Sequence, residues 1–477
     1  KKNMILIVSD TLRMDYLGCY GNPTIHTPHL DAFAKDCVRY TNAHPEALPT
    51  IPVRHTLHSG RRGFPFRNYK PQRWDIVNEP GWQPLDADKD SLAENLAQTG
   101  YYTGFATDTL PYFGPGMNYT RGFWQWEYVR GHSQDKWKSS ATATDGQISR
   151  YVRSPEEARK NFPADIYAAH AANSAQEIHE EDTTTARVFR WGMNFLEDNA
   201  KVSPFYLMLD CFDPHEPWEA PKSYYNLYGD YDQQGKLDLW VPYGAVSDEW
   251  IEKKLPAIHN NYMGKVSLVD AWFGRLIDTL KRLGLYEDTL IVFTADHGTN
   301  FVDNPDHIIG KPCYSLFPGV MNVPLLVHFP QAEGAGTVVD TPLYNVDIPA
   351  TFYAYSGATS EDGIDGVNLH DYLEGYQGRE YLTCRYDEYL WYFDQKRWVV
   401  FDTAGVPRYL FDLVADPKCQ HNLAQTPEAE KPELHEAWAR VLKDAGGSIP
   451  MYDIRNQTDA VGRLISLTRK GAVAKKD

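Results

Sequence analysis

Three side chains with metal-binding chemistry come directly after apolar runs. Asp10 follows Met4–Val8, and Asp296 and His297 follow Leu290–Phe293. Continuous apolar runs of this length are typical of strands buried on both faces. Ligands bind at the carboxyl ends of such strands in open α/β sheets, so we expect the three side chains to meet there. Two carboxylates and an imidazole suit a divalent cation (Mn, Zn, Ca or Mg), whereas each aspartate taken singly could simply cap the next helix or turn.

A second group, Thr50 and Arg54, follows a loop-like run. Thr50 is expected to be the N-cap of a helix with Pro52 in its first turn, which is a sufficient structural explanation of the pattern. The same geometry places a hydroxyl where the helix amides and dipole favour an anion. Arg54, one turn on, would offer a fork-shaped donor to a phosphoryl or sulfuryl oxygen. Because a threonine hydroxyl is a weak nucleophile until a metal or base lowers its pKa, Thr50 is also a candidate metal ligand.

Two further candidates lie in loops after predicted strands. His215 stands between two prolines just after Phe205–Leu209, in a stiff loop where a general acid or an anion contact would fit. Lys311 follows the Asp296 strand by one loop. The structural alternatives are an ordinary loop histidine and a solvated lysine.

The elements that must position these residues alternate between strands and helices. Helical patterns begin at Thr27-Pro28 and cover Ser91–Gln98 and Asn260–Leu283, and a strand-like run covers Tyr101–Ala106. This alternation predicts an α/β fold with a large, mostly parallel sheet between helices. After about Gly375 the pattern changes to a small antiparallel sheet and a helix, expected at Tyr381–Arg385, Tyr389–Phe393, Trp398–Phe401 and Glu428–Lys443.

We therefore predict two domains. Residues 1–375 form a catalytic α/β domain that contains a polar, weakly periodic insertion at 131–182. Residues 376–477 form a small α+β domain, whose basic tail from Arg463 is either a frayed end or an arm that joins protomers in a homo-oligomer.

Composition limits the partners. The charge sum of 47 − 64 gives −17, which disfavours DNA, RNA and anionic membranes, so a small anionic substrate would need positive charge gathered locally. No apolar run approaches the ~20 residues that span a bilayer, so no membrane contact is expected. Six scattered cysteines without CxxC spacing indicate reduced thiols and a cytoplasmic protein, although a chain that begins at Lys1 leaves a trimmed leader open.

Taken together, the motifs resemble the sulfatase-like branch of the alkaline phosphatase superfamily along nearly the whole chain. The matching segments are Ser9-Asp-Thr-Leu-Arg13, Thr27-Pro-His-Leu-Asp31, Pro52-x-Arg54-x-x-Leu57-x-Ser-Gly60, Gly100-Tyr-Tyr-Thr103, Asp213-Pro-His-Glu-Pro217, Val266 to Thr294-Ala-Asp-His-Gly298, Val323-Pro-Leu-Leu326, Val346-Asp-Ile-Pro349 and Tyr409-Leu-Phe-Asp412 to Asn422-Leu-Ala424.

The resemblance implies an alkaline phosphatase-like mixed sheet between helices, followed by a small C-terminal α+β domain. It also implies roles for individual residues. The implied metal ligands are Asp10, Asp296 and His297, the nucleophile position is Thr50, and the anion-contacting or proton-transferring residues are Arg54, His215 and Lys311.

Three departures from the family pattern limit these roles. The usual nucleophile is a Cys or Ser matured to formylglycine, and here it is Thr50. The acidic or amide partner beside the first metal ligand is Thr11. The Lys and His that commonly follow the Gly-Tyr strand are replaced by Thr107-Asp-Thr-Leu110.

The first departure decides the predicted reaction. A formylglycine hydrate releases sulfate by collapsing to its aldehyde, whereas threonine has no second hydroxyl, so water must attack sulfur or phosphorus. Threonine-based relatives in the superfamily handle phosphoryl groups through a phospho-threonine. We predict a metal-assisted hydrolase of phosphate esters, either diesters or phosphonate monoesters, with His215 or Lys311 protonating the leaving group.

Three alternatives stay open. The first is a sulfatase that turns over slowly through Thr50 or through direct attack by water. The second is a phosphoryl-group transferase, against which the lack of membrane-spanning runs argues. The third is a silent fold that binds an anion or a carbohydrate, although the complete set of candidate residues argues against decay.

Two features carry no assigned role. The aromatic residues at 110–130 either line an apolar or sugar leaving-group pocket or pack an insertion or a subunit contact, and we expect this loop near the pocket. A second metal would need further ligands, for which Asp210, Asp213 with His215, or His307 are candidates.

Overall fold

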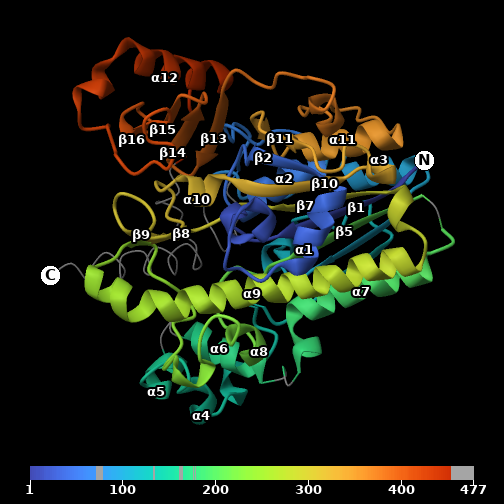
Figure 1. Cartoon of the computed structure of the whole chain (residues 1–477), viewed down its shortest axis with the longest axis vertical. Coiled ribbons are helices and arrows are strands. Elements are labelled where there is room, and N and C mark those ends of the chain that lie inside the picture. The colour runs from blue at the N-terminus through green and yellow to red at the C-terminus, as the bar shows by residue number, and fades with distance from the viewer. Residues whose placement is uncertain are drawn as a thin grey trace.

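The computed structural model describes residues 1–70, 79–132, 135–160, 165–175, 177, 179–202 and 204–452. A nine-stranded sheet runs through it in the order β11-β2-β10-β7-β1-β5-β3-β4, with β12 also paired to β2 (Figure 1). Its strands are β1 (Asn3–Ser9), β2 (Val38–His44), β3 (Tyr102–Thr107), β4 (Gln125–Tyr128), β5 (Phe205–Cys211), β7 (Thr289–Ala295), β10 (Val323–His328), β11 (Val338–Val339) and β12 (Leu343–Tyr344).

The centre of this sheet is parallel. β1 pairs in parallel with both β5 and β7, and β3 and β4 extend the parallel set on one side. On the other side β10 runs antiparallel to β7 and to β2. All residues of β1, β5 and β7 are buried, as expected for strands covered on both faces. The predicted large, mostly parallel mixed sheet is confirmed.

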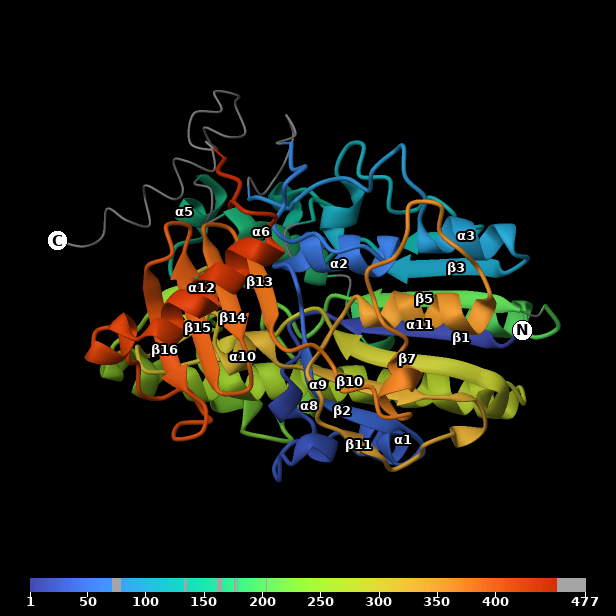
Figure 2. The ribbon, with the colours of Figure 1, turned by 90° about the horizontal axis from the view of Figure 1, so that it is seen from above.

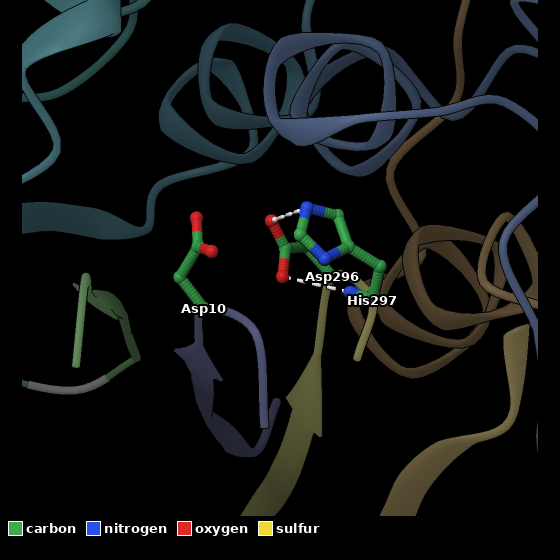
Figure 3. A group of neighbouring side chains, drawn as sticks. All are labelled: Asp10, Asp296 and His297. Carbon is green, nitrogen blue, oxygen red and sulfur yellow. Dashed lines mark hydrogen bonds and ion pairs between the residues drawn. The ribbon is translucent and has the colours of Figure 1, made fainter. Parts of the chain in front are cut away.

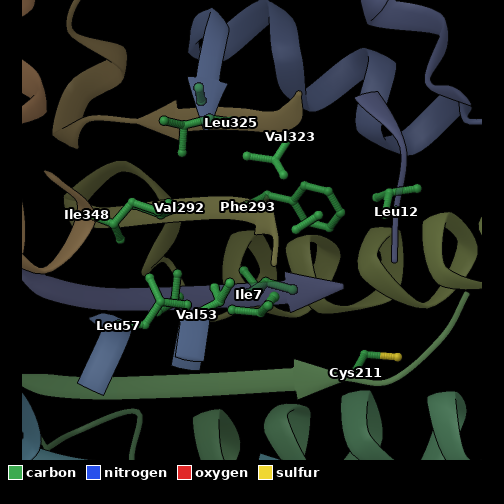
Figure 4. Close-up of a cluster of buried hydrophobic side chains, with 14 of the residues drawn as sticks. Ile7, Leu12, Val53, Leu57, Cys211, Val292, Phe293, Val323, Leu325 and Ile348 are labelled. Atoms are coloured by element: carbon green, nitrogen blue, oxygen red, sulfur yellow. The ribbon is translucent and has the colours of Figure 1, made fainter. Parts of the chain in front are cut away.

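Helices cover both faces of the sheet (Figures 1 and 2). One layer contains α2 (Thr50–Ser59), α3 (Leu92–Gln98) and α11 (Asp347–Ser356), and the other contains α1 (Pro28–Phe33), α7 (Thr184–Asp198) and α9 (Asp248–Arg282). Apolar side chains fill the space between α2 and the sheet. Val53 and Leu57 of α2 and Val292 of β7 are buried members of one apolar cluster (Figure 4). This packing holds the N-terminus of α2 over the strand ends.

Helix α9 is longer than its apolar pattern predicts. It begins at Asp248, where the Ser247 hydroxyl accepts the N–H of Trp250, rather than near residue 260. Its first turns mix charged residues with the partly buried Trp250 and Leu255, and its fully buried residues begin only at Ile258, so the apolar pattern is weak at this end. Among the described residues, no helix combines the length and the apolar character needed to cross a bilayer.

A small helical lobe lies beyond α9 (Figure 1) and contains α4 (Asp145–Ile148), α5 (Pro155–Lys160), α6 (Asp165–Ser174) and the neighbouring α8 (Lys222–Tyr225). It has an apolar cluster of its own that includes Ile148, Ala168 and Leu239. Helices α4, α5 and α6 fall in the segment predicted as an insertion at 131–182, whereas α8 lies outside it, and that boundary stays a prediction.

The C-terminal part contains an antiparallel sheet in the order β13-β14-β15-β16, covered by α12 (Pro432–Asp444). Its strands are β13 (Leu382–Tyr386), β14 (Tyr389–Phe393), β15 (Arg397–Asp402) and β16 (Pro407–Asp412). The Leu48 N–H donates to the Arg385 carbonyl at 3.0 Å, which ties this sheet to the loop before Thr50. The division into residues 1–375 and 376–477 remains a proposal, and the basic tail from Arg463 lies outside the described residues.

A third, three-stranded sheet stands beside the strand ends. It consists of β6 (Gly244–Ala245), β9 (Ile308–Gly310) and β8 (Asn300–Phe301), in that order. Because β9 ends at Gly310, this sheet places Lys311.

Candidate active site

Asp10, Asp296 and His297 come together at the carboxyl end of the parallel strands. Ser9 and Ala295 are the last paired residues of β1 and β7, so the next residue of each strand is an aspartate at the same sheet edge. One ligand atom from each of the three buried side chains lies within 4.8 Å of the others. Figure 3 shows the Asp10 carboxylate facing Asp296 and the His297 ring. The cluster predicted from the two strand ends is therefore assembled.

Hydrogen bonds orient this cluster. Asp296 Oδ1 accepts the backbone N–H groups of Thr11 at 3.0 Å and His297 at 2.7 Å. Nδ1 of His297 donates to the Gly298 carbonyl at 3.0 Å, so Nε2 carries the lone pair. This Nε2 is buried and has no hydrogen-bond partner, which is costly unless something else coordinates it. An orphaned imidazole nitrogen beside two carboxylates fits a divalent cation.

The electrostatics of the cluster agree with this fit. Burial, and then the charge of Asp296, raise the pKa of Asp10 well above its usual value. Burial also raises the pKa of Asp296, but His297 and Arg54 outweigh it and leave that pKa below its usual range. Burial lowers the pKa of His297 to about 4, so its ring is neutral at pH 7 and available as a ligand. Two adjacent buried carboxylates of this kind call for a compensating cation.

Arg54 supplies part of that compensation. A guanidinium has five N–H groups, and five protein oxygens lie within 3.2 Å of its nitrogens. The Asp210 carboxylate accepts from Nε at 2.9 Å and from Nη2 at 2.7 Å. Asp10 Oδ2 lies 3.0 Å from the same Nη2. Nη1 reaches Asp296 and the carbonyl of Thr50, the latter at 3.2 Å. Arg54 was expected to offer its fork to a substrate oxygen, whereas here every donor faces the protein.

Thr50 begins helix α2 but does not cap it. The N-cap is Pro49, no side chain makes a capping hydrogen bond, and Thr50 is the first helical residue. The expectation that Thr50 is the N-cap is therefore wrong, because the chain turns into the helix one residue earlier than the pattern indicates. Thr50 is 4% exposed, and its carbonyl accepts from the same Arg54 Nη1 that reaches Asp296. The Thr50 hydroxyl therefore makes no capping hydrogen bond to α2, so helix capping does not explain a threonine at this position.

Lys311 reaches the cluster through Thr11. Its Nζ donates to Thr11 Oγ1 at 3.1 Å, and that hydroxyl donates to Asp10 Oδ1 at 2.7 Å. Thr11 has a φ of 61°, which is strained for a β-branched residue and is typical of functional sites. Lys311 is buried, so the alternative of a solvated lysine does not describe it.

His215 lies beside Glu216, a residue that the sequence motif contains but that we did not single out. His215 Nδ1 donates to the Glu216 carbonyl at 2.8 Å, and its ring stacks on Phe212 at 4.3 Å. The Glu216 carboxylate is buried, 3.1 Å from His215 Nδ1 and 3.6 Å from Lys311 Nζ, and it accepts from the Tyr243 hydroxyl at 3.1 Å. Burial and the charge of Lys311 lower the pKa of His215 well below its usual value, so the ring is neutral. The signal for Glu216 was a carboxylate between His215 and a proline in a stiff loop.

The residues considered for a second metal are already engaged. Asp210 pairs with Arg54, and Asp213 pairs with Lys265 at 2.5 Å and His132 at 2.9 Å. His307 is half exposed beside an exposed aspartate. In the part of the chain that the structure describes, Asp10, Asp296 and His297 are the one group of His, Cys, Asp or Glu with metal-site spacing.

The aromatic loop at 110–130 divides into two parts. Tyr112 is buried and donates to Asp210 Oδ2 at 2.6 Å, which brings this part of the loop to the site as expected. Trp124 and Trp126, by contrast, are 68% and 48% exposed, the latter on β4 at the sheet edge. The two tryptophans therefore do not form a wall of the site.

Comparisons with known proteins agree with this geometry. The Sulfatase family model matches residues 2–358. The chain is 24% identical to an ulvan-active sulfatase of Formosa agariphila, over 95% of this chain and 83% of that one, and 24% identical to an arylsulfatase of Clostridium perfringens, over 90% and 91%. The crystal structure of a phosphonate monoester hydrolase of Agrobacterium radiobacter has the same fold, with a TM-score of 0.70 at 23% identity, over 93% of this chain and 96% of that one.

The family model covers far more than half of the chain, and both the fold and the strand-end cluster accord with it. The chain belongs to the sulfatase family of the alkaline phosphatase superfamily and is an ester hydrolase.

Proposed function

We propose that this ester hydrolase acts on small anionic phosphate esters, either phosphodiesters or phosphonate monoesters, with Thr50 as its nucleophile. The observation that carries the proposal is Thr50 itself. It stands at the first position of α2 with no capping role, and its carbonyl shares Arg54 Nη1 with Asp296. Threonine has one hydroxyl, so a covalent adduct can be released only by water attacking the central atom. Phosphoryl adducts of this kind turn over by such attack in threonine-based members of the superfamily.

A divalent cation held by Asp10, Asp296 and His297, with Thr50 as a further ligand, would lower the pKa of the Thr50 hydroxyl and polarise the ester. Mn, Zn, Mg and Ca all accept such ligands, and the imidazole favours Mn or Zn. Positive charge for the anion comes from Lys311 as well, against the net charge of −17 on the whole chain.

The reaction has two balanced steps. First the Thr50 oxygen forms a bond to phosphorus while the bond from phosphorus to the leaving oxygen breaks, with net transfer of the hydroxyl proton to the leaving alcohol. Water then forms a bond to phosphorus, the Thr50 oxygen is released, and one water proton returns to it. Of the two candidate proton donors Lys311 is better suited, because His215 is held neutral and its Nδ1 hydrogen is engaged by Glu216.

The test is parallel steady-state kinetics with Mn²⁺ on p-nitrophenyl phosphate, bis-p-nitrophenyl phosphate, p-nitrophenyl phenylphosphonate and p-nitrophenyl sulfate. We expect kcat/KM to be highest on a phosphorus diester or phosphonate, and an acid quench to trap the p-nitrophenyl phosphoryl or phenylphosphonyl group on the peptide that contains Thr50. Sulfate turnover well above that of every phosphorus ester would overturn the proposal.

Sulfate-ester hydrolysis is the second candidate. It is favoured by the family model and by the two relatives, which are both described as sulfatases. The same kinetics distinguish it, and they also address the remaining alternatives. Transfer to an added alcohol in preference to water would indicate a transferase, and bound metal without turnover of any aryl ester would indicate a silent fold.

A further inference from the structure

Asp210 is a buried carboxylate at the site that pairs with Arg54 and is therefore engaged by the protein. It is the sixth residue of β5, and it pairs with Val8 of β1 and Thr107 of β3. Side chains alternate along a strand, and its neighbours Leu209 and Cys211 contact α7 on the other face. Asp210 therefore points toward α2, where it binds Arg54 through two parallel hydrogen bonds of 2.9 and 2.7 Å.

Two hydroxyls complete the surroundings of Asp210. Tyr112 donates to Oδ2 at 2.6 Å, and Thr109 lies 3.4 Å from Oδ1. Both residues are buried. Thr109 belongs to the segment Thr107–Leu110 that stands in place of the basic residues usual in the family, and Tyr112 follows that segment. Each carboxylate oxygen of Asp210 thus accepts from Arg54 and also lies beside one of these two hydroxyls.

The charges of this group have a simple sum. Counting only Arg54 and the carboxylates that it contacts, each ionised, Asp10, Asp210 and Asp296 contribute three negative charges and Arg54 one positive charge, all on side chains that are 0% exposed. The net charge of these four side chains is −2, which one divalent cation neutralises. Without Asp210 the net charge would be −1, and the guanidinium would lose the partner that fixes its orientation.

We propose that Asp210 is the positioning residue of Arg54: it fixes the guanidinium as a permanent cation beside Asp10 and Asp296, and so sets the affinity of the site for a single divalent metal. Tyr112 orients Asp210 in turn. This inference rests on the metal dependence of the proposed function and on neither the nucleophile nor the substrate class. It also accounts for the orientation of Arg54, whose guanidinium nitrogens face the three aspartates and the Thr50 carbonyl.

The experiment uses the full chain and Mn²⁺ alone, titrated calorimetrically into metal-free protein, for Asp210→Asn, Arg54→Met and the double variant. Asp210→Asn should bind Mn²⁺ about tenfold or more weakly, because partners of ligating residues tune affinity by that order. In the double variant only Asp10 and Asp296 stay charged, so the net charge is again −2. This variant should bind Mn²⁺ about as tightly as the unchanged protein, within roughly threefold. Its kcat should be no lower than that of Arg54→Met, because Asp210 acts through Arg54.

A merely structural Asp210 would behave differently. The melting temperature would fall, but Mn²⁺ affinity would change by less than about threefold, and the losses of kcat in the two single variants would multiply in the double variant. Either of these last two results would overturn the proposal. Unchanged activity of Thr50→Ala would overturn the nucleophile assignment and leave the Mn²⁺ result standing.

Tyr112→Phe tests the same proposal without a change of charge. It should weaken Mn²⁺ binding about tenfold, because a less firmly held Asp210 no longer fixes the guanidinium beside Asp10 and Asp296. Tyr119→Phe is the matched control, because this buried tyrosine packs on Tyr112 at 5.0 Å and its hydroxyl donates to the Gln83 carbonyl instead of Asp210. Equal effects of Tyr112→Phe and Tyr119→Phe would contradict the role of Tyr112. If Asp210→Asn does not fold, this comparison is the test that decides whether the proposal stands.

Discussion

Lys311 and Thr11 are 300 residues apart in the chain, and the Lys311 ammonium donates to the Thr11 hydroxyl at 3.1 Å. The Thr11 hydroxyl in turn donates a hydrogen bond to Asp10 Oδ1 at 2.7 Å. The family's usual acidic or amide residue beside the first metal ligand is thus replaced by a hydroxyl that links a cation to that ligand. A third carboxylate at this position would add charge to a buried pair that already requires compensation.

The first prediction concerns this link. Thr11→Val keeps the β-branched shape and the strained backbone but removes the hydroxyl, so Lys311 and Asp10 lose their common partner. We expect kcat to fall about tenfold to a hundredfold, the range found for partners of metal ligands. Thr11→Ser keeps the hydroxyl and should retain most of the activity. Equal rates for the valine and serine variants, at saturating Mn²⁺, would show that the link has no role.

The second prediction concerns the nucleophile. Thr50→Ala should lower kcat about a thousandfold or more, because loss of an attacking group removes the covalent route. Thr50→Ser should restore much of the rate, since serine also supplies a hydroxyl at the first position of α2. Rapid acid quench followed by peptide mass analysis should detect an adduct in the serine variant and none in the alanine variant. An alanine variant that keeps most of its activity excludes Thr50 as the nucleophile.

The third prediction concerns the metal ligands. Asp296→Ala removes one of two carboxylates and leaves the Asp10 charge and His297 Nε2 without a shared cation, so bound metal should fall below about a tenth of an equivalent. Elemental analysis after dialysis against Mn²⁺ measures this directly. Asp288→Ala is the control, because this exposed aspartate precedes the same strand and pairs with Lys2 at the surface. Stoichiometric metal in Asp296→Ala would contradict the ligand assignment.

The fourth prediction separates the two proton donors. Lys311→Met should slow esters with poor leaving groups about a hundredfold or more and nitrophenyl esters far less, because only a basic leaving oxygen needs a proton. His215→Ala should slow both kinds of ester to a similar extent, since a neutral ring whose Nδ1 hydrogen is engaged cannot supply that proton. The measurement is the slope of log kcat against leaving-group pKa. A slope that steepens in His215→Ala and not in Lys311→Met would reverse the assignment.

The sequence predicted the parts of the molecule that depend on local patterns. Buried apolar strands located β1, β5 and β7, and because parallel strands end at one edge, Asp10 and Asp296 could be brought together without a structure. The start of α2 was placed wrongly by one residue, since Thr50 and Pro52 fit both possible beginnings of the helix.

The sequence could not predict which residues contact the site residues, because these contacts join positions far apart in the chain. Arg54 and Asp210 are 156 residues apart in the chain, and Tyr112 and Asp210 are 98 apart. No periodicity connects such positions, and Asp210 was considered only as a ligand for a second metal. The direction of a buried arginine depends on the carboxylates that the fold brings to it, so its role as a fixed charge emerges only from the assembled sheet.

The last prediction concerns Asp213, whose ion pair with Lys265 supports the loop that contains His215. It accepts from Lys265 at 2.5 Å and from His132 at 2.9 Å, and Lys265 also donates to the carbonyls of His215 and Pro217. Asp213→Asn leaves the buried ammonium without its counter-charge, so the free energy of unfolding at pH 7 should fall by about 3 kcal/mol. Adding Lys265→Met should recover part of this loss.

The pH dependence of this effect has a definite sign. Burial raises the pKa of Asp213, but Lys265 and His132 outweigh it and hold that pKa well below its usual value of 3.8. A depressed pKa contributes stability above the unfolded value, and this contribution is lost as the pH falls through 3.8 and below. Urea unfolding of the unchanged protein and of Asp213→Asn should therefore give a difference that is constant from pH 7 to about pH 5 and shrinks at more acid pH. A difference that persists unchanged into the acid range would mean that the lost ion pair is not its cause.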